Sequence, residues 1–109
     1  MNNLPTVIMN EICTTLSVSK ESLISKSRKR ANVEARFICM FFMKKYIKNS
    51  TLEGIGNEIG LDHSSIVYGL NQVDILNQFN PLFKLKFQEC EKSMQFIDPN
   101  YDYQNIAQL

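Results

Sequence analysis

The sequence predicts an all-α protein, a compact bundle of about six helices that contains a helix-turn-helix. Gly (4) and Pro (3) are rare among the 109 residues, so turns are few and helices are favoured over a strand-rich fold. Hydrophobic residues make up 44% of the chain, which is enough for one core in a single domain. Apolar side chains recur every three or four residues along most of the chain, as on the inner face of a helix.

The first two helices are predicted by apolar spacing and by residues that favour helix starts. Residues 4–16 carry leucine, valine and isoleucine at helical intervals, and Pro5 suits the first turn. Ser17 or Ser19 can cap a short second helix that runs to Ile24, because a hydroxyl oxygen there accepts a hydrogen bond from a free backbone N–H. Both helices precede the most basic part of the chain.

A basic loop and a long central helix are expected next. Residues 25–32 are polar and basic and predict a loop, which could include a helical turn. Residues 33–48 are apolar most of the way round the helix and therefore predict the most buried helix of the bundle. The lysines in its last turns suit the negative end of the helix dipole.

Three more helices are predicted in the second half. Thr51, or the serine before it, can cap a helix that stops at Gly60, where a glycine can adopt left-handed backbone conformation. The next helix is expected over 62–76, with a loop at 77–80. A last helix is expected over 81–96, since proline suits its first position. The side chains of this last helix expected to pack inward are Leu82, Leu85, Phe87 and Met94.

These elements predict one domain over 1–97 and a tail over 98–109. The tail is expected to be loose, although its aromatic and aliphatic side chains could dock. The initial methionine and the flanking helices favour a stand-alone small protein, with a domain of a longer chain as the alternative. No signal-peptide pattern is visible, and the most apolar run, 37–43, is far shorter than the ~20 residues that span a bilayer. We therefore expect a cytoplasmic protein without membrane contact.

Several kinds of chemistry are disfavoured by the sequence. Cys13, Cys39 and Cys90 are widely spaced and form no CxxC pair, so buried reduced thiols are expected rather than disulfides or a metal site. The glycines within 54–60 lack the preceding strand and the following Lys-Ser/Thr of a phosphate-binding loop, so no nucleotide is expected. His63 is the only histidine, and no catalytic constellation surrounds it. We therefore expect neither enzymatic activity nor a cofactor.

The charge of the chain is divided between two regions. The formal net charge is only +1, which by itself argues against a nucleic-acid-binding protein. Residues 20–48, however, hold nine basic and two acidic residues, a net charge of +7, whereas the rest of the chain carries −6. A division of this kind predicts a basic face that the overall sum conceals.

Residues 51–76 have the proportions of a helix-turn-helix, in which the start of the second helix meets base edges in the major groove. A carboxylate there can accept a hydrogen bond from a cytosine amino group, and hydroxyls and an imidazole can donate or accept at other bases. The candidate base-contacting residues are Asp62, His63, Ser64 and Ser65. The alternative is that Asp62 or Ser64 only caps the helix and that His63 is an ordinary surface histidine.

A second cluster of candidate contacts lies upstream, within residues 25–32. Its cations could follow phosphates, and one arginine could enter a minor groove narrowed by A·T pairs. These cations are Lys26, Arg28, Lys29 and Arg30. The alternative is a solvated surface loop, which is the usual role of a charge run. Taken together, the two clusters favour double-stranded DNA as the partner.

An ordered series of motifs carries a family resemblance. The segments are Leu23–Arg30, Val33–Arg36, Leu52–Gly60 and Asp62–Val67. In this order they resemble the C-terminal DNA-binding domain of the bacterial replication initiator DnaA, over residues 4 to 96. The resemblance implies an all-helical, Trp-repressor-like domain that binds a short, A/T-rich duplex box. It implies a role in replication initiation or its control, without the nucleotide-binding module of the initiator.

The resemblance also implies roles for individual residues. Asp62, His63, Ser64 and Ser65 fall on the base-reading positions of the family in the major groove, and Arg28 falls on its minor-groove arginine. Arg36 and Lys44 fall on positions that contact the DNA backbone or bases beside the groove. Lys26, Lys29 and Arg30 lie near Arg28 and are expected to add phosphate contacts.

The chain departs from the family pattern at three places. Only Gly60-Leu61 stands before Asp62 where the family has Gly-Gly-Arg, Phe37 replaces a glutamine, and Asn71-Gln72 replaces an Arg-Lys pair. Each change removes a polar or cationic contact, so the preferred DNA sequence is expected to differ. The alternative function is a protein-interaction module, using the acidic C-terminal half, or a transcriptional regulator with weakened DNA affinity.

Overall fold

The computed structural model describes residues 4–100 and confirms the all-α class. Within this range it contains six helices and no strand. Their bounds are α1 Leu4–Leu16, α2 Lys20–Ile24, α3 Arg30–Tyr46, α4 Leu52–Ile59, α5 His63–Phe79 and α6 Pro81–Met94. The tail predicted at 98–109 lies mostly outside the described residues.

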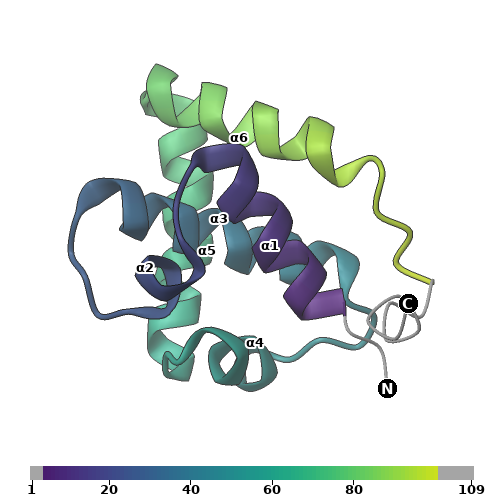
Figure 1. Cartoon of the computed structure of the whole chain (residues 1–109). Helices are drawn as coiled ribbons and strands as arrows, with labels where there is room; N and C mark the ends of the chain where they lie inside the picture. Colours follow the sequence, from purple (N-terminus) through teal and green to yellow (C-terminus); the bar gives the residue numbers. More distant parts are fainter. Residues whose placement is uncertain (1–3, 101–109) are drawn as a thin grey trace.

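The long helix α3 is at the centre of the bundle, as its apolar pattern predicts. It packs against all five other helices, which surround it (Figure 1). Helix α6 packs against α1 and against α5, the helix that precedes it in the chain. Helix α4 packs against α5 and α3 below them in this view. This arrangement leaves the first turns of α5 at the periphery of the bundle.

The core consists of aliphatic side chains and stacked aromatic rings. Ile8 and Ile12 of α1 and Ile38 of α3 are completely buried. The rings of Phe42 and Phe87 stack with their centroids 5.3 Å apart, which joins α3 to α6. Because burial stabilises each such side chain by about 1.5–3 kcal/mol, these contacts hold the helices in place around α3.

The central helix begins earlier than the predicted residue 33. Helix α3 starts at Arg30 and ends at Tyr46, so the helical turn that the sequence allowed within 25–32 lies in its last three residues and is part of α3. Asn32 is already helical, and its amide Nδ2 donates to the Ser27 hydroxyl over 3.0 Å. Arg30 therefore lies in the first turn of a helix rather than in the loop.

The loop predicted at 77–80 is also wrong. Helix α5 continues through Phe79, and Asn80 alone separates it from α6. Asn80 donates its backbone N–H to Leu76 at the end of α5, and its side chain accepts from the backbone N–H of Phe83. The chain bends here because Pro81 restricts the residue before it and cannot continue the α5 hydrogen-bond ladder.

The inward face of α6 differs in part from the prediction. Phe87 and Met94 are buried as expected, together with Phe83 and Cys90. Leu82 and Leu85, in contrast, are 72% and 58% exposed. The buried residues recur at intervals of four, three and four, which places the two leucines on the outer side of the helix.

The three cysteines are free and buried, as expected for reduced thiols. Burial raises the pKa of the Cys90 thiol to about 12 and that of Cys39 well above its ordinary value. Both thiols therefore stay protonated at neutral pH, which leaves them unreactive. In the described part of the chain, no helix is long and apolar enough to span a membrane.

Candidate nucleic-acid interface

The turn between α4 and α5 is compact and depends on two glycines. Gly60 has a φ of +82°, in the left-handed region, which confirms the predicted helix stop. The backbone N–H groups of Gly60 and Leu61 both donate to the carbonyl oxygen of Gly56, over 2.7 and 2.9 Å. Gly56 itself lies so close to the turn that a Cβ there would collide with the Leu61 carbonyl oxygen. Helices α4 and α5 thus meet in a tight helix-turn-helix.

Asp62 caps the second helix of this motif. Its Oδ1 accepts the backbone N–H of Ser65 over 2.8 Å, and this hydrogen bond, together with one from the Ser65 side chain, lowers the pKa of the carboxyl group. The capping role considered from the sequence is therefore real for Asp62, and the helix begins one residue later, at His63.

The other predicted residues at the head of α5 are accessible. His63 and Ser64 are exposed, whereas Ser65 is half-buried beneath them. None of the three lies in the core, where Ile66 is the first fully buried residue of α5. A polar surface of imidazole and hydroxyl groups thus projects from the end of a helix, as groove reading requires.

The basic loop at 25–29 is ordered by a series of serine hydrogen bonds. The Ser25 hydroxyl donates to the Ser22 carbonyl over 2.8 Å and accepts the backbone N–H of Ser27 over 3.2 Å. The Ser27 hydroxyl oxygen in turn accepts the backbone N–H of Lys29, also over 3.2 Å. Hydroxyl–backbone bonds of this kind replace a regular ladder, so the loop keeps a defined course.

Arg36 holds this loop from below rather than extending to the surface. It is 9% exposed, its Nε donates to the Leu23 carbonyl over 2.9 Å, and its Nη2 donates to the Ser27 carbonyl. Burial lowers the pKa of the guanidinium, and the two carbonyls compensate for the lost water. The structure thus shows an internal, positioning role for Arg36 and leaves little of its side chain exposed for the expected contact with the DNA backbone or with bases beside the groove.

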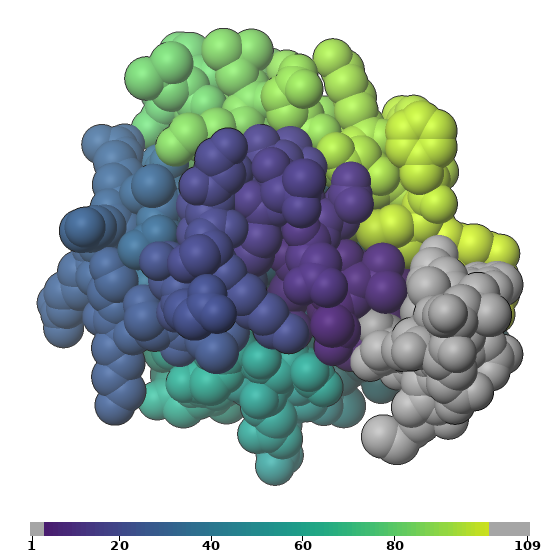
Figure 2. Space-filling model, in the orientation of Figure 1, coloured from purple at the N-terminus to yellow at the C-terminus, as the bar shows by residue number. Residues whose placement is uncertain are grey.

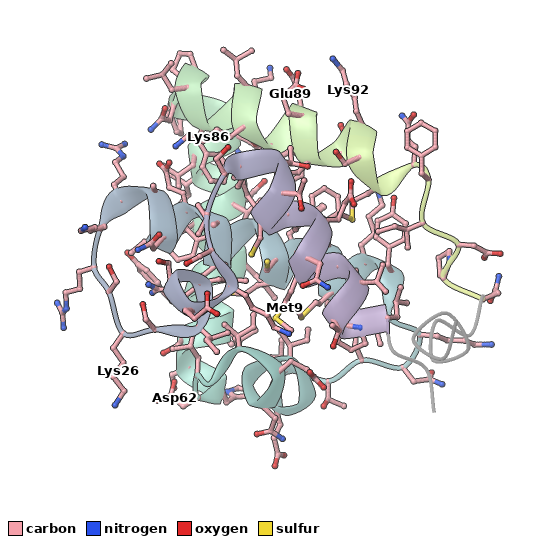
Figure 3. All side chains as sticks on the ribbon, in the orientation of Figure 1. Met9, Lys26, Asp62, Lys86, Glu89 and Lys92 are labelled. Carbon is pink, nitrogen blue, oxygen red and sulfur yellow. The ribbon has the colours of Figure 1, made fainter. Side chains whose placement is uncertain are left out.

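The remaining predicted cations project into solvent. Lys26, Arg28 and Lys29 are exposed on the loop, and Lys44 is exposed near the end of α3, where its Nζ lies 3.4 Å from the Ser50 carbonyl oxygen. In the space-filling view, the loop and the start of α3 form the projecting left edge of the molecule (Figure 2). Lys26 and Asp62 both point outward at the lower left of the side-chain view (Figure 3).

Arg30 is exposed but is already part of an ion-pair network. Its Nε lies 3.2 Å from one oxygen of Glu34, while Nζ of Lys86 lies 2.8 Å from the other. The Glu34 side chain is only 7% exposed, so this carboxylate joins the start of α3 to α6. Sequence reasoning missed this role, because Glu34 and Lys86 are 52 residues apart and no local signal connects them.

A surface pocket brings the basic loop and α5 together. It is lined by Arg28 of the loop, Phe37 of α3 and Leu76 of α5, among others. The aromatic pair of Phe37 and Tyr68 also lies between α3 and α5, with ring centroids 6.0 Å apart. The sequence-based set of candidate contacts did not include Tyr68, although its position four residues after Ser64 places both side chains on the same face of the helix.

The comparison with family models decides what this arrangement is. The model described as the bacterial dnaA protein helix-turn-helix matches residues 5–73. The chain belongs to this family. The match extends from α1 into α5, so it contains the basic loop, the turn at Gly60 and the exposed head of α5, and the DnaA resemblance of the sequence is confirmed.

Relatives of this DnaA-family chain carry the name chromosomal replication initiator protein DnaA. The protein from Flavobacterium psychrophilum is 40% identical over 68% of this chain and 16% of its own length. Those from Gloeobacter violaceus and a Synechococcus species are 35% and 29% identical, over 62% and 84% of this chain and 15% and 20% of theirs. The chain thus spans a fifth or less of the length of these relatives.

Proposed function

We propose that this DnaA-family chain is a sequence-specific binding module for double-stranded DNA, acting in replication initiation or its control. The observation that carries the proposal is the pairing of an exposed polar head on α5 with an ordered basic loop in one helix-turn-helix domain. The head of α5 enters the major groove and contacts bases through four residues, of which Ser65 is half-buried and the others are exposed. These residues are Asp62, His63, Ser64 and Ser65. No catalytic step is assigned to the chain.

The basic loop supplies the second set of proposed DNA contacts. Arg28 enters the adjacent minor groove, which is narrowest and most negative in A/T-rich sequence, so a short A/T-rich box is the proposed target. Lys26, Lys29, Arg30 and Lys44 neutralise phosphates and supply most of the affinity. Arg36 contributes indirectly, by holding the loop.

Binding should fall steeply with salt. If five exposed cations each neutralise a phosphate, about that many counterions are released from the DNA, and log affinity should fall with log salt concentration with a slope of about −4 to −5. Fluorescence anisotropy of labelled duplexes, selected from a random pool and titrated at several salt concentrations, measures this slope. Absence of binding to any A/T-rich duplex at low salt would refute the proposed function.

Two substitutions should separate base reading from phosphate contact. His63→Ala should weaken binding to the selected duplex by ~1–3 kcal/mol and reduce the difference in affinity between the selected duplex and a scrambled one. Lys29→Gln should lower the affinity for both duplexes by the same factor and reduce the magnitude of the salt slope by about 1. Anisotropy titrations of both variants on both duplexes provide the measurement; equal loss on both duplexes for His63→Ala would contradict its base-reading role.

A protein-interaction module is the second candidate function, and one surface feature favours it. Phe79, Leu82 and Leu85 are 77%, 72% and 58% exposed where α5 meets α6. Clustered apolar side chains of this kind often contact another protein. Co-purification of a stable partner that is unaffected by changes at Arg28 and His63 would support this candidate, and a monomer that binds duplex DNA would count against it.

A further inference from the structure

Two aromatic rings lie on the surface between the basic loop and the head of α5. Tyr68 is 59% exposed, although its side chain is large and mostly apolar. Its ring meets that of half-buried Phe37 edge-on, with an interplanar angle of 68°. An edge-on aromatic pair is favourable by about 0.5–1.5 kcal/mol beyond area burial, so the exposed ring of Tyr68 is held in place.

The position of this pair relative to the proposed DNA contacts follows from its neighbours. Phe37 lines the same surface pocket as Arg28, so it adjoins the basic loop. Tyr68 follows Ser64 by four residues on α5, which places both on one face of the helix. A continuous surface therefore runs from Arg28 across Phe37 and Tyr68 to Ser64.

A close crossing of two helices fixes this surface. A Cβ on Gly69, the residue after Tyr68, would lie 3.1 Å from a ring carbon of Phe37. The Phe37 and Met40 side chains of α3 therefore pack directly onto the backbone of α5 beside the aromatic pair. Tyr68 is held against Phe37 beside this crossing, and more than half of its surface is open to solvent.

A duplex that contacts both Arg28 and the head of α5 presents its sugar–phosphate backbone to the surface between these two contacts. If α5 occupies the major groove and Arg28 the adjacent minor groove, a single sugar–phosphate strand separates the two contacts. The groups facing the middle of the surface are then phosphate oxygens and deoxyribose. A tyrosine hydroxyl is a frequent donor to such a phosphate oxygen, and its ring can cover the sugar.

We propose that Tyr68 is a DNA-backbone contact, whose hydroxyl donates to the phosphate between the two grooves, and that Phe37 is the positioning residue for its ring. This inference rests on the proposed function. The contact carries no charge and reads no base, so it adds affinity without changing either the sequence preference or the number of counterions released.

The test removes a single oxygen atom. Tyr68→Phe should weaken binding by about ten- to a hundredfold, as expected for loss of a hydrogen bond to a charged group. The loss should be equal on selected and scrambled duplexes, and the salt slope should not change. Tyr46→Phe is the matched control, because that ring stacks on Phe42 at the other end of α3 and should bind as the parent chain does.

A second substitution tests the role of Phe37. Phe37→Leu should weaken binding to about the same degree as Tyr68→Phe, and the double variant should be no weaker than either single one. Thermal unfolding of each variant establishes that the compared chains are folded. A merely structural role for Phe37 would instead lower affinity by the same factor in both backgrounds, which would overturn its assignment.

The outcomes separate this inference from the function on which it rests. Tyr68→Phe binding equal to that of the parent chain, or a loss on one duplex sequence only, would overturn the backbone contact and leave the proposed function standing. A parent chain that binds no duplex would overturn both.

Discussion

Replacing Arg36 by methionine should lower the free energy of unfolding by about 2–4 kcal/mol and weaken duplex binding as well. The methionine retains much of the apolar stem but donates no hydrogen bond. The Leu23 and Ser27 carbonyls then lose their charged donor, and a buried acceptor without a partner costs about 1–3 kcal/mol. Urea unfolding followed by circular dichroism measures the change in stability.

The loss of binding in this variant should have a recognisable pattern. The basic loop would lose its attachment to α3, so the cations of the loop would no longer be held at fixed positions. We expect weaker binding together with a smaller difference between A/T-rich and scrambled duplexes, because Arg28 is part of this loop. Arg36→Lys should recover little of the stability or affinity lost in Arg36→Met, because one ammonium group does not reproduce the two hydrogen bonds of the forked guanidinium.

Lys45→Met is the matched control for Arg36→Met. It removes a cation from the same helix at an exposed position and should change stability by less than about 0.5 kcal/mol. If Arg36→Met instead left the stability unchanged and reduced the magnitude of the salt slope by about 0.9, Arg36 would contact a phosphate directly, as the sequence predicted.

Helix boundaries that depend on neighbouring residues could be predicted from the sequence. Ser19, Thr51 and Asp62 each accept a backbone N–H three residues later, as capping residues do. Gly60 ends α4 in left-handed conformation. In each case the chemistry involved spans only three or four residues, so the local pattern contains all the information required.

The parts of the site that could not be predicted depend on contacts between distant residues. Arg36 resembles a surface cation in the sequence, and only the folded chain shows that the carbonyls 9 and 13 residues before it surround its guanidinium. The outward position of Leu82 and Leu85 likewise depends on the rotation of α6 against α1 and α5, which its own spacing did not resolve. Charge and apolarity alone do not determine which face a long side chain occupies.

Gly56→Ala should destabilise the domain by about 2–3 kcal/mol, although alanine favours a helix over glycine by about 1 kcal/mol. The reason is the turn that follows. A Cβ at this position would overlap the carbonyl oxygen of Leu61, which is backbone and cannot move as a flexible side chain does. The turn would have to open, which strains the two hydrogen bonds that Gly60 and Leu61 make to the Gly56 carbonyl.

Gly54→Ala is the matched control for this prediction. Gly54 lies on the same helix but is exposed, and its nearest neighbour would be the hydroxyl of the capping Thr51 at 3.1 Å, which would have to move by only a few tenths of an ångström. This variant should be as stable as the parent chain or slightly more stable. Urea midpoints of the two alanine variants provide the comparison, and equal midpoints would contradict the proposed collision.

The effect on DNA binding should exceed what lost stability explains. The turn at Gly60 sets the angle between α4 and α5, so opening it redirects the head of α5 even in molecules that remain folded. At a temperature well below its unfolding midpoint, Gly56→Ala should therefore lose affinity for the selected duplex by at least about tenfold, because base contacts require placement to within about 0.5 Å. Anisotropy titration under conditions where circular dichroism shows a folded chain measures this effect. Full affinity there would show that the head of α5 is placed independently of the turn.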